Sequence, residues 1–258
     1  MIIDTHTHLL DTKFDNDRFS VIEKAYLTGI KKFLEVSCDI ESWDTAIHFS
    51  DTKNMFIALG IHPYNLIKNK PEKKSYDKLH FLARAKKCLA IGEIGLDFHY
   101  NRSNEIINNQ IECLLKQLNI AHKLNKPVIL HCRDAYDDMI NIFRKNKIAP
   151  LKGVVHCFSG TLKQALELLD FGLYLGIGGK LTYRKEKILK QIVYKIDINK
   201  LVVETDCPYL PPKKYVGTRN EPSYITETVK EITRIRKTTI THIEDILTKN
   251  ALNLFKFY

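Results

Sequence analysis

The chain has 258 residues, enough to bury one full hydrophobic core and close to the length of a single α/β barrel. It carries 40 basic and 30 acidic side chains, and the formal charge of +10 favours an anionic partner such as nucleic acid. The lysines are scattered, so a general richness in lysine is the alternative explanation. No signal peptide and no apolar run that could span a bilayer is present, so we expect a cytoplasmic protein without a membrane partner.

The six cysteines lie far apart and form no Cys-x-x-Cys pair, so neither a zinc ribbon nor a disulfide framework is predicted. Cys132, Cys157 and Cys207 each directly follow a histidine or an aspartate at a predicted strand end. Because adjacent residues of a strand face opposite sides, we expect these three thiols to be buried on the outer face of the sheet.

Strand-like and helix-like segments alternate along the whole chain, which predicts a parallel sheet with crossover helices. The first strand begins at the first residues. Seven more strands are expected at residues 30–37, 55–61, 88–94, 128–131, 153–156, 173–177 and 201–206. Helices are expected at residues 18–28, 103–124, 223–236 and 241–256, and a polar basic loop at 68–78. No internal repeat or linker suggests a second domain, so we predict one TIM-like (β/α)8 barrel over residues 1–258.

The first strand leads directly into His6 and His8. Side chains alternate along a strand, so both imidazoles should point the same way and form half of a metal site. A pair of polar strand-end residues is the alternative. The remaining ligands must come from other parts of the chain.

Further candidate ligands stand at the ends of later strands. Glu93 lies among apolar residues and glycines, where a carboxylate is costly unless it is paired or bound to a metal. Catalytic groups of α/β barrels gather at the C-terminal ends of the strands. The six predicted metal ligands are therefore His6, His8, Glu93, His131, His156 and Asp206.

Four imidazoles and two carboxylates are enough for two divalent ions if one carboxylate bridges them, and we assign that role to Glu93. Such donors suit zinc or manganese, and magnesium is less expected with so many imidazoles. Two ions of this kind cleave phosphodiesters and related esters. Asp206 is predicted to orient or deprotonate the attacking water while it ligates one ion, so Glu93 and Asp206 are the predicted catalytic residues.

Three further residues are candidates for binding phosphate oxygens, namely His62, Arg133 and Arg219. Three acids are candidates for supporting the ligands from behind, namely Asp97, Glu204 and Glu221. For each of them the alternative is a turn hydrogen bond or an ion pair that shapes a loop.

Residues 3–8, 92–97, 127–135, 156–160 and 204–210 together resemble the TatD family of metal-dependent deoxyribonucleases, a branch of the amidohydrolase-type barrels. The loop at 219–222 is also similar to that family, and the likeness runs from the first residue to the final helices. It implies a TIM-like barrel with two metals, DNA cleavage often from the 3′ end, and a cytoplasmic location. It also implies that Glu93 replaces the carboxylated lysine of related amidohydrolases, which favours the TatD branch over dihydroorotase-like enzymes.

The sequence therefore predicts a monomeric metal-dependent deoxyribonuclease with DNA as its partner, and the resemblance implies 3′-to-5′ exonuclease polarity. The first alternative is a metal-dependent hydrolase of another ester or amide, such as an aminoacyl-tRNA deacylase. The second is a nucleic-acid-binding or structural barrel whose metal only holds strands together. Structural zinc sites are usually closed four-ligand sets rich in cysteine, and the predicted set is neither.

Overall fold

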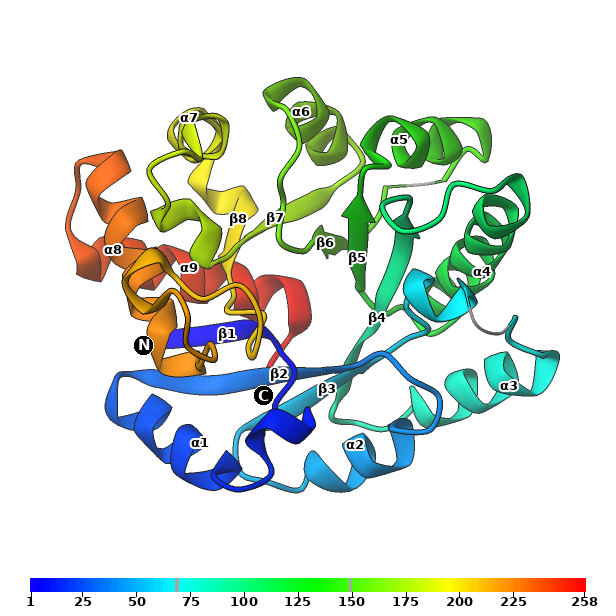
Figure 1. Cartoon of the computed structure of the whole chain (residues 1–258), viewed down its shortest axis with the longest axis horizontal. Helices are drawn as coiled ribbons and strands as arrows, with labels where there is room; N and C mark the ends of the chain where they lie inside the picture. Colours follow the sequence, from blue (N-terminus) through cyan, green and yellow to red (C-terminus); the bar gives the residue numbers. More distant parts are fainter. Residues whose placement is uncertain (68–69, 149) are drawn as a thin grey trace.

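The computed structural model describes residues 1–67, 70–148 and 150–258, and within them eight parallel strands form one sheet. Each strand pairs with the next one along the chain, so the spatial order is β1 to β8. Figure 1 shows the sheet curving round on itself with the helices outside it. The strands are β1 Ile2–Thr7, β2 Ile30–Ser37, β3 Met55–Leu59, β4 Cys88–Asp97, β5 Val128–Arg133, β6 Gly153–Val155, β7 Leu173–Ile177 and β8 Leu201–Val203.

The barrel closes where the segment after β8 meets β1. The parallel bridge there joins Thr7 and Cys207, and the amide of His8 donates to the Cys207 carbonyl at 2.8 Å. Nearby, the buried carboxylate of Asp4 accepts from both the amide and the hydroxyl of Thr205, at 3.0 and 2.6 Å. The predicted single-domain TIM-like barrel is confirmed. Its closure brings the first motif, at residues 3–8, against the last, at residues 204–210.

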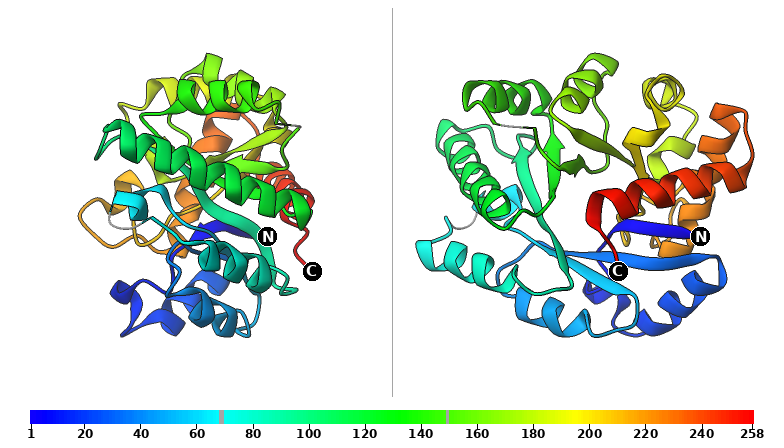
Figure 2. Two further views of the ribbon diagram at one scale, coloured as in Figure 1. Left: turned by 90° about the vertical axis from the view of Figure 1, so that its right-hand side faces the viewer. Right: turned by 180° about the vertical axis from the view of Figure 1, so that it is seen from behind.

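Helices follow the strands and surround the barrel (Figures 1 and 2). The four predicted helices are present within a few residues of their expected bounds. The segment at 68–78, predicted as a loop, is helical from Lys73 onward, because Tyr76 and Leu79 supply an apolar face that the lysine-rich composition obscured; residues 68–69 lie outside the described residues. The helices are α1 Arg18–Leu27, α2 Trp43–Phe49, α3 Lys73–Leu82, α4 Asn104–Lys123, α5 Tyr136–Lys145, α6 Leu162–Asp170, α7 Lys187–Lys195, α8 Ile225–Arg236 and α9 Ile240–Phe255.

Two buried glutamines of α4 hold the ends of the neighbouring strands. Gln117 accepts from the Ile61 amide at 2.7 Å and donates to the Ile61 carbonyl at 3.2 Å. Gln110 makes the same pair of bonds, each of 2.9 Å, to the backbone of Asp97. An amide side chain can satisfy a backbone N–H and a backbone carbonyl at once, so the backbone at Ile61 and at Asp97 is held in place by α4. The side chains of His62 and Asp97 line the cavity at the barrel mouth.

The buried apolar side chains of the described residues form two separate clusters. The larger cluster fills the layer between the strands and the surrounding helices, and it contains Cys132 and Cys207, as predicted. The smaller cluster lies within the barrel and combines alternate strand residues, such as Ile129 and Val154, with Leu254 and Phe255 of α9. Seen from behind in Figure 2, α9 and the C-terminus cross this end of the barrel. The opposite end of the interior is left for polar groups.

No helix in residues 1–67, 70–148 and 150–258 combines the length and the apolar character that crossing a bilayer needs.

Candidate metal centre

A cavity of about 470 Å³ opens at the C-terminal ends of the strands. Five of the six predicted metal ligands line it, and the sixth, His6, lies directly beneath them with no exposed side-chain surface. His62 and Arg133 line it as well. The barrel thus brings residues from β1, β3, β4, β5, β6 and the segment after β8 to one place.

The first half of the site comes from β1 and the segment after β8. The Nε2 atoms of His6 and His8 lie 3.2 Å apart, so the two imidazoles share a face as predicted. Asp206 Oδ1 is 3.3 Å from His8 Nε2 and 3.7 Å from His6 Nε2. Glu93 Oε2 completes this half at 3.4 Å from His6 Nε2.

The second half is arranged around the other oxygen of Glu93. Its Oε1 lies 2.7 Å from His131 Nδ1, 2.8 Å from His156 Nε2 and 3.4 Å from His62 Nε2. One carboxylate therefore faces both groups of imidazoles, each through a different oxygen. This is the geometry that a bridging ligand requires.

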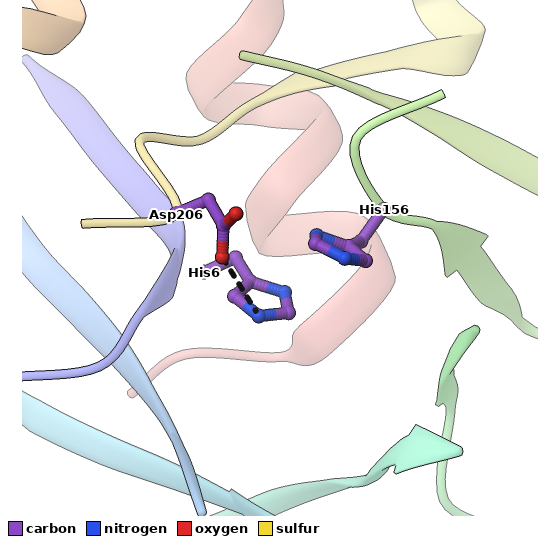
Figure 3. A group of neighbouring side chains, drawn as sticks. All are labelled: His6, His156 and Asp206. Atoms are coloured by element: carbon purple, nitrogen blue, oxygen red, sulfur yellow. Dashed lines mark ion pairs between the residues drawn. The ribbon is translucent and has the colours of Figure 1, made fainter. Parts of the chain in front are cut away.

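His6 of the first half and His156 of the second half lie next to each other (Figure 3). Their rings stack with centroids 4.0 Å apart, and Asp206 approaches His6 from the other side. Asp206 has a φ of 59°, in the left-handed region that residues other than glycine rarely adopt. Such strain is frequent at functional sites, because the surrounding structure must enforce it. Here it aims the carboxylate back over β1.

The charges of the site compensate one another. Burial alone would raise the pKa of Glu93, but His156, His62 and His131 hold it well below its usual range. Burial would also raise the pKa of Asp206, but the contacts with His8 and His156 outweigh this effect and lower it. In turn, Asp206 raises the pKa of His8 to about 9 against the effect of burial. Protons on the imidazoles thus balance the carboxylates, and bound cations would take the place of those protons.

Second contacts orient the ligands. His8 Nδ1 lies 2.8 Å from the Val36 carbonyl, which directs its Nε2 into the site. Asp97 Oδ2 is 3.0 Å from His131 Nε2, and Glu204 Oε1 is 3.6 Å from His156 Nδ1. A hydrogen bond such as the one to Asp97 sets the tautomer of a metal-binding histidine. The separation between Glu204 and His156 is too long for a hydrogen bond, so Asp97 supports a predicted ligand directly and Glu204 only lies beside one.

The donor set is suited to a cation. In the part of the chain that the structure describes, four combinations of three side chains bring their ligand atoms within 4.8 Å of one another. Three of them draw on the predicted ligands and His62, and the fourth joins His156 with Cys157 and Glu204. Among the described residues, the buried Nδ1 atoms of His6 and His156 have no hydrogen-bond partner. A neutral imidazole with a protonated Nδ1 leaves its Nε2 lone pair free, which is the form that binds a metal. The residues therefore fit divalent ions.

Two of the residues predicted for the outer site, Arg219 and Glu221, are engaged in ion pairs away from the cavity. The Arg219 guanidinium donates to both oxygens of Asp17, at 2.8 and 2.7 Å, and to Glu221 at 3.2 Å. Glu221 also accepts from Lys24. Within the described residues, neither Arg219 nor Glu221 is part of the cavity lining. They clamp the loop before α8 onto α1, which is the ion-pair alternative, and the spacing of the motif could not reveal the partner Asp17.

Three groups at the site were missed or misplaced. Glu35 is buried, and it accepts from the amides of Leu9 and Leu10 at 2.6 and 3.0 Å. Cys38 lines the cavity with its Sγ 3.6 Å from Glu93 Oε2. Cys157 was expected on the outer face, but it has a φ of 43° and its Sγ lies 3.9 Å from Asp206 Oδ2.

A signal existed for Glu35 alone, since it is an acid within an apolar strand, as Glu93 is. The two thiols could not have been found in this way. Cys38 follows the last residue of β2, and Cys157 lies in a turn, so strand alternation does not apply to either of them.

Comparisons with known proteins place the chain among metal-dependent hydrolases. The family described as TatD related DNase matches residues 3–256. The uncharacterized metal-dependent hydrolase YabD of Bacillus subtilis is 34% identical over 257 residues, covering 99% of each chain. The uncharacterized metal-dependent hydrolase YcfH of Escherichia coli is 30% identical, covering 98% of this chain and 95% of its own.

Solved structures give the same answer for the fold. The crystal structure of YjjV, a TatD homologue from Escherichia coli, superposes with a TM-score of 0.90 at 28% identity, covering 99% of this chain and 98% of that one. A TatD family hydrolase from Entamoeba histolytica superposes with a TM-score of 0.85 at 24% identity, covering 98% of this chain and 97% of its own.

A barrel with histidines and carboxylates converging at its C-terminal face defines a metal-dependent hydrolase. The predicted enzyme class is thereby confirmed. Within that class, the chain belongs to the TatD-related DNase family.

Proposed function

We propose that the protein is a deoxyribonuclease that hydrolyses DNA phosphodiester bonds with water activated by two divalent ions, working from the 3′ end. The observation that carries this proposal is the position of Glu93, whose two oxygens face two separate groups of imidazoles. One carboxylate between two sets of nitrogen donors suits a pair of ions, as phosphodiester cleavage requires. Zinc and manganese suit these donors better than magnesium.

The ions would supply positive charge to the phosphoryl oxygens and lower the pKa of the attacking water. Asp206 is the group placed to accept the proton of that water, because its carboxylate faces the cavity and its lowered pKa keeps it ionised. Asp97 holds the ring of His131 in place through its 3.0 Å contact. Glu204 lies beside the ring of His156.

Two residues at the cavity wall are suited to bind the phosphate. Arg133 is exposed at the end of β5, and His62 follows β3. An arginine can grip phosphate oxygens with two hydrogen bonds. The formal charge of +10 would draw a polyanion to the enzyme. We expect the enzyme to act as a monomer in the cytoplasm.

The test is degradation of a single-stranded DNA oligonucleotide labelled at the 3′ or the 5′ end. Metal-stripped protein receives zinc, manganese or magnesium, and Glu93→Ala and Asp206→Ala are compared with the wild type. Stepwise loss from the 3′ end that needs metal and disappears in both variants is the expected result. Glu23→Gln, a change of an exposed acid on α1, is the matched control and should cleave like the wild type.

A different outcome selects the other ester hydrolases. If folded protein binds two ions but cleaves no oligonucleotide with any metal, the deoxyribonuclease proposal is rejected. Turnover of an aminoacyl ester under the same conditions would then identify the enzyme as a deacylase that uses the same site. Binding of metal with a rise in unfolding temperature and no hydrolysis of either substrate would leave only a structural role for the ions.

A further inference from the structure

Three exposed tyrosines line the described cavity, namely Tyr64, Tyr100 and Tyr209, and two of them, Tyr64 and Tyr100, lie against each other. Tyr64 lies in the short 3-10 helix Pro63–Ile67 after β3, and Tyr100 follows β4. Their side chains are exposed by 41% and 59%, and the rings meet edge to face with centroids 5.2 Å apart. Both line the same cavity as Glu93 and His131.

An arginine fixes one of these rings. The Nη1 atom of Arg133 donates to the Tyr100 hydroxyl at 3.0 Å, and the guanidinium carbon lies 5.1 Å from the centre of the ring. This combines a hydrogen bond with a cation–π contact, so the guanidinium and the ring orient each other. Arg133 pairs with Asp97 across the β4–β5 ladder, and the Asp97 carboxylate holds His131. The aromatic pair is therefore coupled directly to the wall of the metal centre.

Exposure of a tyrosine is ordinary by itself, but Tyr64 and Tyr100 offer two adjoining rings. Tyr209 lines the same cavity, but its hydroxyl donates to Asp11 and its ring meets His8 rather than a second tyrosine. Tyr64 and Tyr100 instead present ring surface at the edge of a polar cavity, beside a cation. Aromatic surface next to a positive charge is the combination with which proteins hold single-stranded nucleic acid, because each base has a face to stack and each linkage has a phosphate.

We propose that Tyr64, Tyr100 and Arg133 form a subsite for one nucleobase beside the phosphodiester that is cleaved. The base stacks on the tyrosine surface, while the guanidinium of Arg133 beside the Tyr100 ring reaches the adjoining phosphate. This inference rests on the proposed function and names the part of the substrate that positions it. Stacking does not depend on base identity, so the subsite holds any base that is free of its partner strand.

The test pairs two substrates with four variants. The substrates are a 3′-labelled single-stranded DNA and the same strand with an abasic nucleotide next to the scissile bond, placed on each side of the bond in turn. The variants are Tyr64→Leu, Tyr100→Leu, Tyr100→Phe and, as the matched control, Tyr194→Leu. Tyr194 lies on α7, outside the cavity lining, and is 60% exposed.

Loss of one stacking contact should raise KM for the normal strand about ten-fold in Tyr64→Leu and Tyr100→Leu, with kcat changed less than two-fold. For the wild type, KM should rise by the same factor when the abasic nucleotide replaces the stacked base. With the abasic strand, the leucine substitutions should raise KM little further, because the base that the tyrosine ring would stack on is already missing. Tyr100→Phe keeps the ring and should stay within two-fold of the wild type, as should Tyr194→Leu.

Other outcomes overturn the subsite. An equal loss on the normal and abasic strands would mean that the tyrosines only support the fold, and a ten-fold loss in Tyr100→Phe would assign the effect to the hydroxyl that holds Arg133. In both cases wild-type cleavage of the normal strand would leave the proposed function intact. If the wild type cleaves no oligonucleotide with any metal, the proposed function fails, and the nucleobase subsite fails with it.

Discussion

The two ends of the barrel interior solve the same packing problem with opposite chemistry. At the N-terminal end, strand residues such as Ile129 and Val154 pack against Phe255 of α9, and nothing polar is needed. Two residues further along the same strands, His131 and His156 surround Glu93. The sealed end gains free energy from burying apolar surface, whereas the open end contains charges that burial makes costly.

The comparison shows that the functional end of the barrel carries the free-energy cost of burying charged side chains. Each charge at the open end is tolerated because an opposite charge touches it, as Asp206 does for His8. Removal of one partner leaves the other buried and uncompensated, which typically costs several kcal/mol. At the sealed end every residue contributes by its volume alone. Substitutions at the two ends should therefore separate activity from stability.

The largest effect is expected for Glu93→Gln. It removes the negative charge that both imidazole groups share, so hydrolysis should fall by about 10³-fold or more. Metal added to the stripped wild type should raise its unfolding temperature, because a ligand that binds only the native state stabilises it. The rise should be smaller in the variant. Activity and unfolding are measured with the same metal-stripped samples, and a variant that keeps a tenth of wild-type activity would contradict the bridging role.

The opposite pattern is expected for Phe255→Ala at the sealed end. Phe255 is buried in the interior cluster, so the cavity left behind should lower the free energy of unfolding by about 3 to 5 kcal/mol. Activity per folded molecule should change less than two-fold. Urea denaturation gives the stability, and Leu166→Ala on the exposed face of α6 is the matched control. A loss of activity beyond the loss of folded protein would show that the two ends are coupled.

Between the two ends, Glu35 should give stability a pH dependence. Burial raises the pKa of Glu35 from 4.5 to about 7 in the folded protein, so the native state holds a proton that the unfolded chain releases. The stabilisation from this group is complete below pH 4.5 and is lost as the pH rises through about 7. The loss is on the order of 3 kcal/mol. The difference between metal-free wild type and Glu35→Gln should show this slope, and parallel curves would refute the assignment.

The smallest effect is expected for Arg219→Ala. Its ion pair with Asp17 is partly exposed, so its loss should cost at most about 1 kcal/mol of stability. The ratio kcat/KM should stay within two-fold of the wild type, since Arg219 contacts Asp17 and Glu221 rather than the cavity. A ten-fold increase in KM would restore the phosphate-binding role that the sequence suggested.

The alternation of apolar runs and helical segments was enough to predict the barrel, because each strand is short, apolar and followed by a crossover. Bounds were less certain where composition concealed the pattern. The strand predicted at 88–94 continues to Asp97, and the strand predicted at 201–206 stops at Val203. In both places backbone pairing with the neighbouring strand decides the end, and a single sequence does not contain the position of that neighbour.

The ligand set was predicted because polar residues at the ends of apolar strands have few structural explanations. The outer residues were harder, since an arginine in a loop finds its partner only in three dimensions. Arg133 reaches the cavity because it continues β5, whereas Arg219 is held by Asp17 of a distant segment. The aromatic surface of Tyr64 and Tyr100 has no sequence pattern at all.

By itself, the sequence predicted the barrel, the candidate metal ligands and the ends of the strands on which they lie. Only the tertiary structure decided how each of these side chains turns toward the others. On β5 simple alternation carries His131 to the same side as Ile129. On β1 and β4 the register shifts between Asp4 and Thr7 and between Ile91 and Ile94, where three residues oppose two on the partner strand. The extra residue turns His6 and Glu93 inward, which strict alternation from Ile3 and Ala90 would prevent.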